Sequence, residues 1–371
     1  MVFKVKKHIM SRINIVKPSL TFDEISPRLE KIINSGIYSN GTNITEFSAE
    51  ISKLTKAKYC FPTSSATTAL WTCLKILKIG EGDEVLVSDF SYPATVNVIE
   101  DLGAKPIFVD VSLEDFNMKP EELEKKISSK AKAVIFVDAL GNPSGINKIR
   151  QICNNRKLIL IEDAACAIGS SENGENCGSI SDLTCFSFHP RKVICAGEGG
   201  AITTNNKTFA DNLKIKLSHG AKLDSKGNLK FIQFGYNFRI SEIQALLALV
   251  QIKKLTKIID VRQKIWKIYK EALIPLGFKA QHIKKNVHFN VQSATFIVPR
   301  DISASELILK MKEKEIDCSI GTFSLSTIDY YLKKYKDPQK NSSFLMNNTI
   351  TLPCFDGLNV EKVIKTIKLS L

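Results

Sequence analysis

The segment TSSATTAL, residues 63–70, joins small hydroxylated residues to the start of an apolar pattern with helical spacing. Backbone N–H groups are free in the first turn of a helix, and together with nearby hydroxyls they bind phosphate well. Serine and threonine also begin helices as ordinary N-caps. The segment alone therefore leaves a phosphate site and a plain helix start both open.

The segment IEDAA, residues 161–165, places Asp163 at the end of an apolar run. An unpaired carboxylate is costly in such buried surroundings, so Asp163 needs a positively charged partner. The protonated ring nitrogen of an electron-sink cofactor is one such partner. A helix N-cap or an internal ion pair is the alternative.

The segment SFHPRK, residues 187–192, ends in Lys192 and is followed by the glycine-rich AGEGG, residues 196–200. This pattern predicts a strand, a loop that presents one lysine, and then a flexible turn. A lysine becomes a nucleophile when its surroundings favour the neutral amine, and the positive charge of Arg191 has that effect. Taken by itself, Lys192 would be a surface residue.

Short apolar runs alternate with helical patterns between residues 59 and 202, which is typical of a mainly parallel sheet covered by helices on both faces. Ligands of such sheets bind at the carboxyl ends of the strands. Asp89, Asp138 and Asp163 are expected at those ends. The predicted strands lie at residues 82–88, 105–111, 132–138 and 157–163.

A chain of 371 residues exceeds the usual span of one hydrophobic core, so two domains are expected. A long helix is predicted from about residue 241 to 272, with the boundary in or just after it. We divide the chain into an N-terminal segment with a large domain, residues 1–255, and a small C-terminal α/β domain, residues 256–371. Within the small domain we expect strands at residues 289–298 and 349–353, and helices at 303–314 and 359–370.

The composition, 44% apolar and 24% charged, is that of a soluble globular protein. No apolar run approaches the roughly 18 residues of a membrane span, and the opening residues lack the apolar core of a secretory signal. Nine cysteines without CxxC pairs or partnered histidines favour reduced thiols in a cytoplasm over disulfides or a metal site.

The net charge of +14 could attract nucleic acid or another anionic partner. The lysines are spread along the chain, and no basic block interleaved with aromatic residues is present. This distribution favours a solvated lysine-rich surface, with attraction of a phosphorylated substrate as the alternative. We expect no nucleic-acid partner and no membrane partner.

Together these segments resemble the DegT/DnrJ/StrS family of sugar-nucleotide aminotransferases, which depend on pyridoxal 5′-phosphate (PLP). Four motifs follow the family's order, and Asp163 precedes Lys192 by the family's interval. They are TSSATTAL, EDAA, SFHPRK with GEGG, and GYNFRISEIQA at residues 235–245. The resemblance extends from residue 13 to 358 and implies the α/β fold of fold-type I PLP-dependent transferases: a large domain with a mainly parallel sheet between helices, plus a smaller C-terminal α/β domain.

By this resemblance Lys192 is the Schiff-base lysine, and Asp163 pairs with the ring nitrogen of the cofactor. Tyr92 stands where the family has an aromatic ring stacked on the cofactor. Cys166 stands where the family commonly has a glutamine or histidine that hydrogen-bonds the cofactor hydroxyl.

The resemblance also assigns a phosphate site to Ala66, Thr67 and Ser187. Asn237 matches the asparagine that reaches the phosphate from the neighbouring subunit, which implies a homodimer with shared active sites.

Three features depart from the family. Ala66 replaces the usual glycine but keeps its backbone N–H. Cys166 is a weak donor, so it either tunes the cofactor's electronics or packs as a small apolar residue beneath the ring. The segment GTFSLS, residues 321–326, replaces a proline- and histidine-containing segment near the nucleotide-sugar site, which makes the substrate the least transferable inference.

Three other residues each have two interpretations. His189 either takes part in the lysine loop's chemistry or packs as a hydrogen-bonded histidine. His219 either lines the site or ends a helix. Arg239 either binds a substrate anion or forms an ion pair with Glu242.

The resemblance implies a PLP-dependent aminotransferase, with pyridoxamine 5′-phosphate (PMP) as the intermediate form of the cofactor. It would move an amino group from glutamate to the keto group of a nucleotide-activated deoxysugar. One alternative is a PLP-dependent sugar dehydratase, but in those relatives a histidine replaces the lysine that is present here as Lys192. The other is a non-catalytic PLP-binding regulator, for which we expect no room for a DNA-binding appendage outside the matched region.

Overall fold

The computed structural model describes residues 12–371. Residues 1–11, which hold most of the opening segment in which no secretory signal is expected, lie outside the described residues. Within residues 12–371 no helix is both long and apolar enough to cross a membrane.

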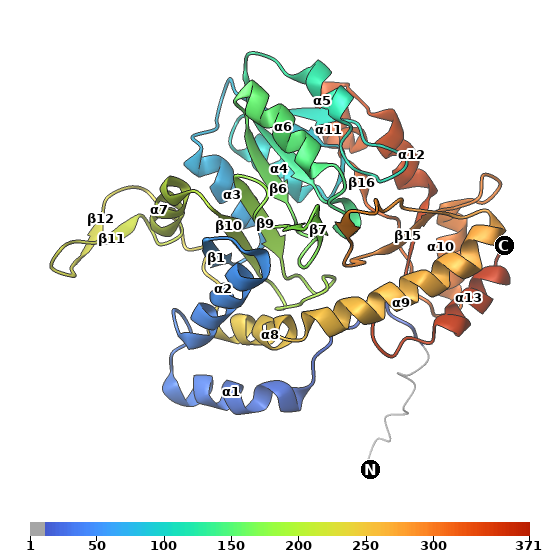
Figure 1. Ribbon diagram of the computed structural model, residues 1–371, viewed down its shortest axis with the longest axis horizontal. Helices are drawn as coiled ribbons and strands as arrows, with labels where there is room; N and C mark the ends of the chain where they lie inside the picture. The colour runs from blue at the N-terminus through green and yellow to red at the C-terminus, as the bar shows by residue number, and fades with distance from the viewer. Residues whose placement is uncertain (1–11) are drawn as a thin grey trace, which may run out of the picture.

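A seven-stranded sheet forms the centre of the larger part of the molecule (Figure 1). Five neighbouring strands run parallel, and at one edge β10 pairs antiparallel with β9 and β1 pairs antiparallel with β10. The order is β1 (Tyr59–Thr63), β10 (Gly200–Thr204), β9 (Leu183–Ser187), β6 (Ile159–Asp163), β5 (Ala131–Val137), β2 (Glu84–Ser88) and β4 (Lys105–Val109). The predicted mainly parallel sheet is confirmed.

Alternation along the strands divides the core into layers, because successive strand side chains point to opposite faces of a sheet. Val85, Val87 and Ile161 pack beneath α3 (Ala66–Ile76) and α4 (Ala94–Asp101). Leu86, Val134 and Leu160 pack beneath α6 (Ile146–Arg156) on the other face. Further helices cover the sheet, namely α2 (Thr42–Thr55), α5 (Pro120–Lys126), α7 (Lys207–Lys216) and α8 (Glu242–Ile252). By the same alternation, Asp163 faces the α3 and α4 layer and Glu162 faces away from it.

The C-terminal part is a three-stranded antiparallel sheet packed against helices. It consists of β13 (Lys279–Ala280), β15 (Ala294–Ile297), β17 (Thr349–Leu352), α10 (Ala304–Glu313) and α13 (Val360–Lys368), with α9 (Leu255–Leu273) along one side. The helices predicted at residues 303–314 and 359–370 and the strand predicted at 349–353 are confirmed. The strand predicted at 289–298 is confined to β15, because the left-handed φ of 54° at Val291 interrupts the extended backbone. Two helices were not predicted, α11 (Asp329–Tyr335) and α12 (Lys340–Asn348).

The single long helix predicted for residues 241–272 is wrong, because α8 and α9 are separate helices. The chain leaves helical geometry at Lys254, with φ −115° and ψ 17°. The break lets α8 pack in the core of the large part, while α9 turns its apolar side to the C-terminal sheet. The domain boundary between residues 255 and 256 stays a prediction.

Short pairings connect the two parts. Ile13 pairs with Ile316, so the N-terminal segment contacts the C-terminal part before α1 (Phe22–Ser35) begins. Two strand pairs also join the parts, β3 (Phe90–Ser91) with β16 (Phe323–Ser324) and β7 (Ser171–Glu172) with β14 (Val287–His288). Two others lie within the large part, β7 with β8 (Glu175–Asn176) and β11 (Ala221–Leu223) with β12 (Leu229–Phe231). The 3₁₀ turns are η1 (Ala139–Gly141), η2 (Ile274–Leu276) and η3 (Leu325–Thr327).

Asp89 ties β2 to the C-terminal part. Its buried carboxylate accepts hydrogen bonds from the hydroxyl of Ser324 at 2.9 Å, from the hydroxyl of Ser326 at 2.8 Å, and from the hydroxyl of Ser342. The backbone N–H of Ser326 donates a fourth, at 2.7 Å. Burial raises the pKa of Asp89 to about 6, and the hydrogen bonds only partly oppose this rise. Asp89 therefore fastens the two parts together and does not line an open ligand site.

We predict that Asp89→Ala lowers the free energy of unfolding by about 3 kcal/mol at pH 7, because it leaves buried donors without an acceptor. The raised pKa of Asp89 adds wild-type stability that is fully present below its ordinary value of 3.8 and is lost as the pH rises through about 6. The difference in free energy of unfolding between the wild type and Asp89→Ala should therefore be about 1 kcal/mol larger at pH 5 than at pH 7. Denaturant unfolding measures both values, with exposed Asp301→Ala as the control. A loss below that of the control would contradict the fastening role.

Candidate active site

The capping hydrogen bonds at the start of α3 leave two backbone N–H groups free. The Ser65 hydroxyl accepts a hydrogen bond from the Thr68 backbone N–H at 3.1 Å, and the Ser65 N–H donates to the Thr68 hydroxyl at 3.2 Å. The N-cap interpretation is therefore correct. It does not exclude a phosphate, because the first N–H groups of the helix, those of Ala66 and Thr67, have no acceptor within the helix.

Gly200 closes one side of this helix start. A Cβ atom at Gly200 would lie 2.4 Å from the carbonyl carbon of Ser65 and 2.7 Å from the backbone nitrogen of Ala66. Gly200 also pairs with buried Ser187 across β9 and β10. The glycine-rich segment thus brings Ser187 beside the free N–H groups of α3, as expected for the three predicted phosphate residues.

Asp163 lies at the carboxyl end of β6 and is only 4% exposed. Its Oδ2 accepts a hydrogen bond from the Thr95 hydroxyl at 2.8 Å, and its Oδ1 accepts one from the Ala165 N–H at 3.2 Å. Burial raises the pKa of Asp163, whereas the Thr95 hydrogen bond and the positive charge of Lys192 lower it. No lysine, arginine or histidine of residues 12–371 forms a salt bridge with it. The predicted need for a cationic partner therefore stands.

Lys192 reaches back toward Asp163 from the loop after β9. It is half-buried, and its Nζ donates to the Sγ of Cys166 at 3.1 Å. Cys166 follows Asp163 by three residues, so one short turn presents both the carboxylate and the thiol to the lysine. This arrangement gives the site one cation and one buried anion.

The C-terminal part holds the backbone on both sides of Lys192. The Gln292 amide donates to the Arg191 carbonyl at 2.7 Å and accepts from the Val193 N–H at 2.9 Å. The Asn290 amide donates to the Cys166 carbonyl at 2.9 Å. These contacts were not predicted, because the sequence around residue 290 has only an ordinary strand pattern.

The residue between these two amides is strained. Val291 has a φ of 54°, which is unusual for a β-branched residue. Its carbonyl accepts a hydrogen bond from buried Arg262 at 2.8 Å, and the Gln292 carbonyl accepts another at 2.7 Å. Arg262 thereby stabilises a backbone conformation that directs the side chain of Gln292 at the loop that carries Lys192 and the side chain of Asn290 at the turn that carries Cys166.

Two predicted site residues are exposed. Tyr92 is 65% exposed, and its ring centroid lies 6.0 Å from that of Phe323. Asn237 makes no side-chain hydrogen bond to any described residue, while the next residue, Phe238, accepts a backbone hydrogen bond from Ser64 at 2.7 Å. Both side chains are free to contact something outside this chain.

The three residues with two interpretations are placed as follows. His189 accepts a hydrogen bond from the Arg191 N–H at 3.2 Å. This bond orders the loop that follows β9 and carries Lys192. His219 has a left-handed φ of 58° just beyond the end of α7. The proposed pair between Arg239 and Glu242 does not form, because Glu242 accepts hydrogen bonds at the start of α2 instead. The Nε of Arg239 is buried without a partner among residues 12–371.

Comparison with known proteins identifies the family of this chain. The model of the DegT/DnrJ/EryC1/StrS aminotransferase family matches residues 21–369. The chain belongs to this family. GDP-perosamine synthase of Escherichia coli O157:H7 is 32% identical over 356 residues, which cover 96% of each chain. GDP-perosamine synthase of Vibrio cholerae is 30% identical over 358 residues, with 95% of this chain and 96% of the relative covered.

Solved structures of aminotransferases are similar to this chain. The PLP form of a Streptococcus pneumoniae protein assigned as a sugar aminotransferase has a TM-score of 0.90 and 25% identity, covering 97% of this chain and 98% of that one. The PMP form has a TM-score of 0.89. The aminotransferase PseC of Helicobacter pylori, at 22% identity and a TM-score of 0.90, shows the same fold. The predicted fold-type I architecture is confirmed, and the protein is a PLP-dependent aminotransferase.

The residues present fit this cofactor. The helix start closed by Gly200 offers free N–H groups to a phosphate. Asp163 offers a buried carboxylate that lacks a salt-bridge partner in the described chain. The roles of the individual residues stay predictions.

We predict that Cys166→Gln shifts the pH at which the absorption band of the bound cofactor changes. A glutamine amide is a stronger hydrogen-bond donor than a thiol, and position 166 lies within contact of Lys192. Cofactor affinity should change little, because the phosphate contacts and Asp163 are retained. A spectrophotometric pH titration of the folded variant measures the shift. An unchanged titration would show that Cys166 only packs beneath the ring.

Proposed function

We propose that this protein transfers an amino group, with glutamate as the donor, to the keto group of a nucleotide-activated deoxysugar. The observation that carries the proposal is that half-buried Lys192 and buried Asp163 lie at the ends of neighbouring strands, where the positive charge of Lys192 lowers the pKa of Asp163, next to a helix start that suits a phosphate. The two GDP-perosamine synthase relatives, each matched over 95% or more of this chain, support a sugar nucleotide as the acceptor.

Each residue has a separate task in this proposal. Lys192 attaches the cofactor through Nζ, and when Nζ is free it moves a proton within the site. Asp163 holds a proton on the ring nitrogen by offering a buried negative charge. PLP supplies the electron sink that allows an amino group to leave one substrate and join another.

The remaining residues bind and orient. The N–H groups of Ala66 and Thr67 and the hydroxyl of Ser187 hold the phosphate. Tyr92 would cover the ring of the cofactor. Cys166 accepts a hydrogen bond from Lys192 Nζ and so helps to orient it.

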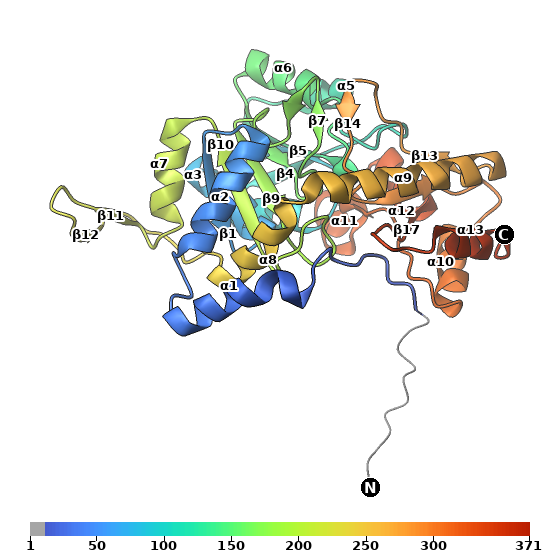
Figure 2. The same ribbon diagram turned by 60° about the horizontal axis from the view of Figure 1, so that its bottom comes forward.

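The same proposal includes a homodimer. The hairpin of β11 and β12 projects away from the body of the molecule (Figure 2) and exposes large apolar side chains. They are Leu223, Leu229, Phe231, Ile232 and Phe234, between 57% and 70% exposed. Apolar side chains gathered on a projecting hairpin favour burial against another protein surface, and Asn237 follows directly after them.

We also propose a location in the cytoplasm. All nine cysteines, at positions within residues 12–371, are free thiols in this structure. Reduced thiols are typical of proteins kept in a reducing compartment.

The reaction is tested by supplying glutamate and a panel of keto-sugar nucleotides that differ in base and in keto position. We expect one or a few members to give an aminated sugar nucleotide together with 2-oxoglutarate, and Lys192→Ala to give none. Mass spectrometry of the products measures the transfer. Formation of 2-oxoglutarate with a non-sugar acceptor, and with no sugar nucleotide, would contradict the proposed substrate class.

The shared site is tested with mixed subunits. Lys192→Ala and Asn237→Ala subunits should each be inactive or strongly impaired alone. A heterodimer of the two would rebuild one intact site of two, so about half of the wild-type activity should return. Purification with two different affinity tags verifies the heterodimer. No recovery would show that Asn237 serves the site of its own chain.

A further inference from the structure

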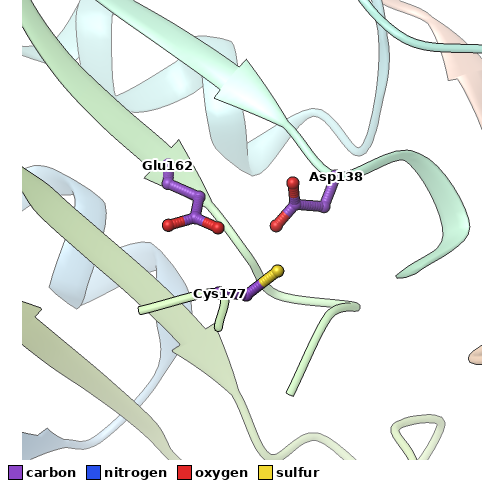
Figure 3. A group of neighbouring side chains, drawn as sticks. All are labelled: Asp138, Glu162 and Cys177. Atoms are coloured by element: carbon purple, nitrogen blue, oxygen red, sulfur yellow. The ribbon is translucent and has the colours of Figure 1, made fainter. Parts of the chain in front are cut away.

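Two buried carboxyl groups meet on the face of the sheet opposite to the Asp163 side chain. Asp138 follows β5, Glu162 lies in β6, and Cys177 follows β8; the two carboxyl groups point toward each other and the sulfur lies beside them (Figure 3). One ligand atom of each side chain lies within 4.8 Å of the others. Asp138 and Glu162 are fully buried and Cys177 is nearly so.

The hydrogen bonds of the two carboxyl groups are unequal. Glu162 Oε2 accepts from the Thr184 hydroxyl at 2.7 Å, the Gly178 N–H at 3.2 Å and the Ser181 hydroxyl at 3.3 Å. Glu162 Oε1 and both oxygens of Asp138 receive no donor from the described residues. No basic residue of that part of the chain forms a salt bridge with either group.

Two ionised carboxylates side by side in such a core would be strongly unfavourable, since the donors of Glu162 oppose only its own desolvation and nothing offsets the repulsion between the two charges. A proton on Asp138 removes that repulsion and the desolvation cost of one charge, and the resulting O–H can donate to the free Oε1 of Glu162. The anion belongs on Glu162, which alone has three donors to stabilise it. Burial and the negative charges of Glu162 and Asp163 raise the pKa of Asp138, and burial raises the pKa of the Cys177 thiol.

We propose that Asp138 and Glu162 share one proton, carried by Asp138 and donated to Glu162, and that this pair positions the strand ends beneath the cofactor site. Asp138 is therefore a positioning residue that acts through its neighbours. This inference does not depend on the substrate proposed above.

The contacts of the Asp138 backbone connect the pair to the site. Its N–H donates to the Asp163 carbonyl at 3.2 Å, and its carbonyl accepts from the Gly141 N–H at 3.0 Å. Gly141 has a φ of 100°, and a Cβ there would lie 2.8 Å from the Cys166 carbonyl oxygen and 2.2 Å from Asn290 Oδ1. A shift of Asp138 would thus displace the turn that supports Cys166.

Infrared spectroscopy of the cofactor-loaded enzyme at neutral pH tests the proton directly. Asp138→Asn should remove the carbonyl band of a protonated carboxyl group, whereas exposed Asp301→Asn should remove an ionised carboxylate band. Loss of an ionised carboxylate band on Asp138→Asn would overturn the proposal. So would a metal ion bound one per chain in wild type and absent from the variant, because the three side chains also have metal-ligand spacing.

The pH dependence of stability gives an independent test. The folded protein keeps a proton on Asp138 that the unfolded chain releases above the ordinary value of 3.8, so wild-type stability from this group is lost as the pH rises. Between pH 5 and pH 7, the unfolding equilibrium constant of wild type should rise relative to that of Asp138→Asn by about tenfold per pH unit. A constant ratio would overturn the shared proton.

Cofactor binding tests the positioning role. Asp138→Asn keeps both the shape and a donor toward Glu162, so its dissociation constant for PLP should stay within about twofold of wild type. Asp138→Ala loses the donor, and its affinity should fall about tenfold or more, which corresponds to roughly 1.4 kcal/mol. Equal losses in the two variants, or no loss in a folded Asp138→Ala, would overturn the role.

Discussion

The buried negative charge of Asp163 is the constraint on which the site depends. The carboxylate sits at a strand end with one hydroxyl and one backbone N–H as its donors. Burying a charge in this way is unfavourable unless a positive charge comes close to it. Lys192 supplies part of that charge from the next strand's loop, and the protonated ring of the cofactor completes it in the proposed enzyme. The parallel sheet matters because it places these two strand ends side by side.

The lysine loop is held by a part of the chain that lies about one hundred residues later. Gln292 and Asn290 fix the backbone around Lys192 and Cys166. Arg262, buried and bonded to three backbone carbonyls, holds the strained Val291 between them. Strain of this kind persists only where surrounding contacts enforce it. The C-terminal part therefore helps to shape the site as well as to cover it.

The sequence was informative where one segment determines its own structure. Continuous apolar runs identified the parallel strands, and Asp163 and Lys192 stood out because a strand end and a glycine-rich loop carry them. The break at Lys254 was missed because both sides of it favour helix, and only packing against two different cores separates them. Thr95, Asn290 and the Asp138–Glu162 pair were missed because their partners come from other strands and helices.

We propose that Lys192 is the residue that attaches the cofactor. Borohydride reduction of the yellow, PLP-loaded protein, followed by proteolysis and peptide mass spectrometry, tests it most directly. We expect a reduced pyridoxyl group on Lys192 alone, and no labelled peptide from Lys192→Ala. A pyridoxyl group on any other lysine would contradict the site described above.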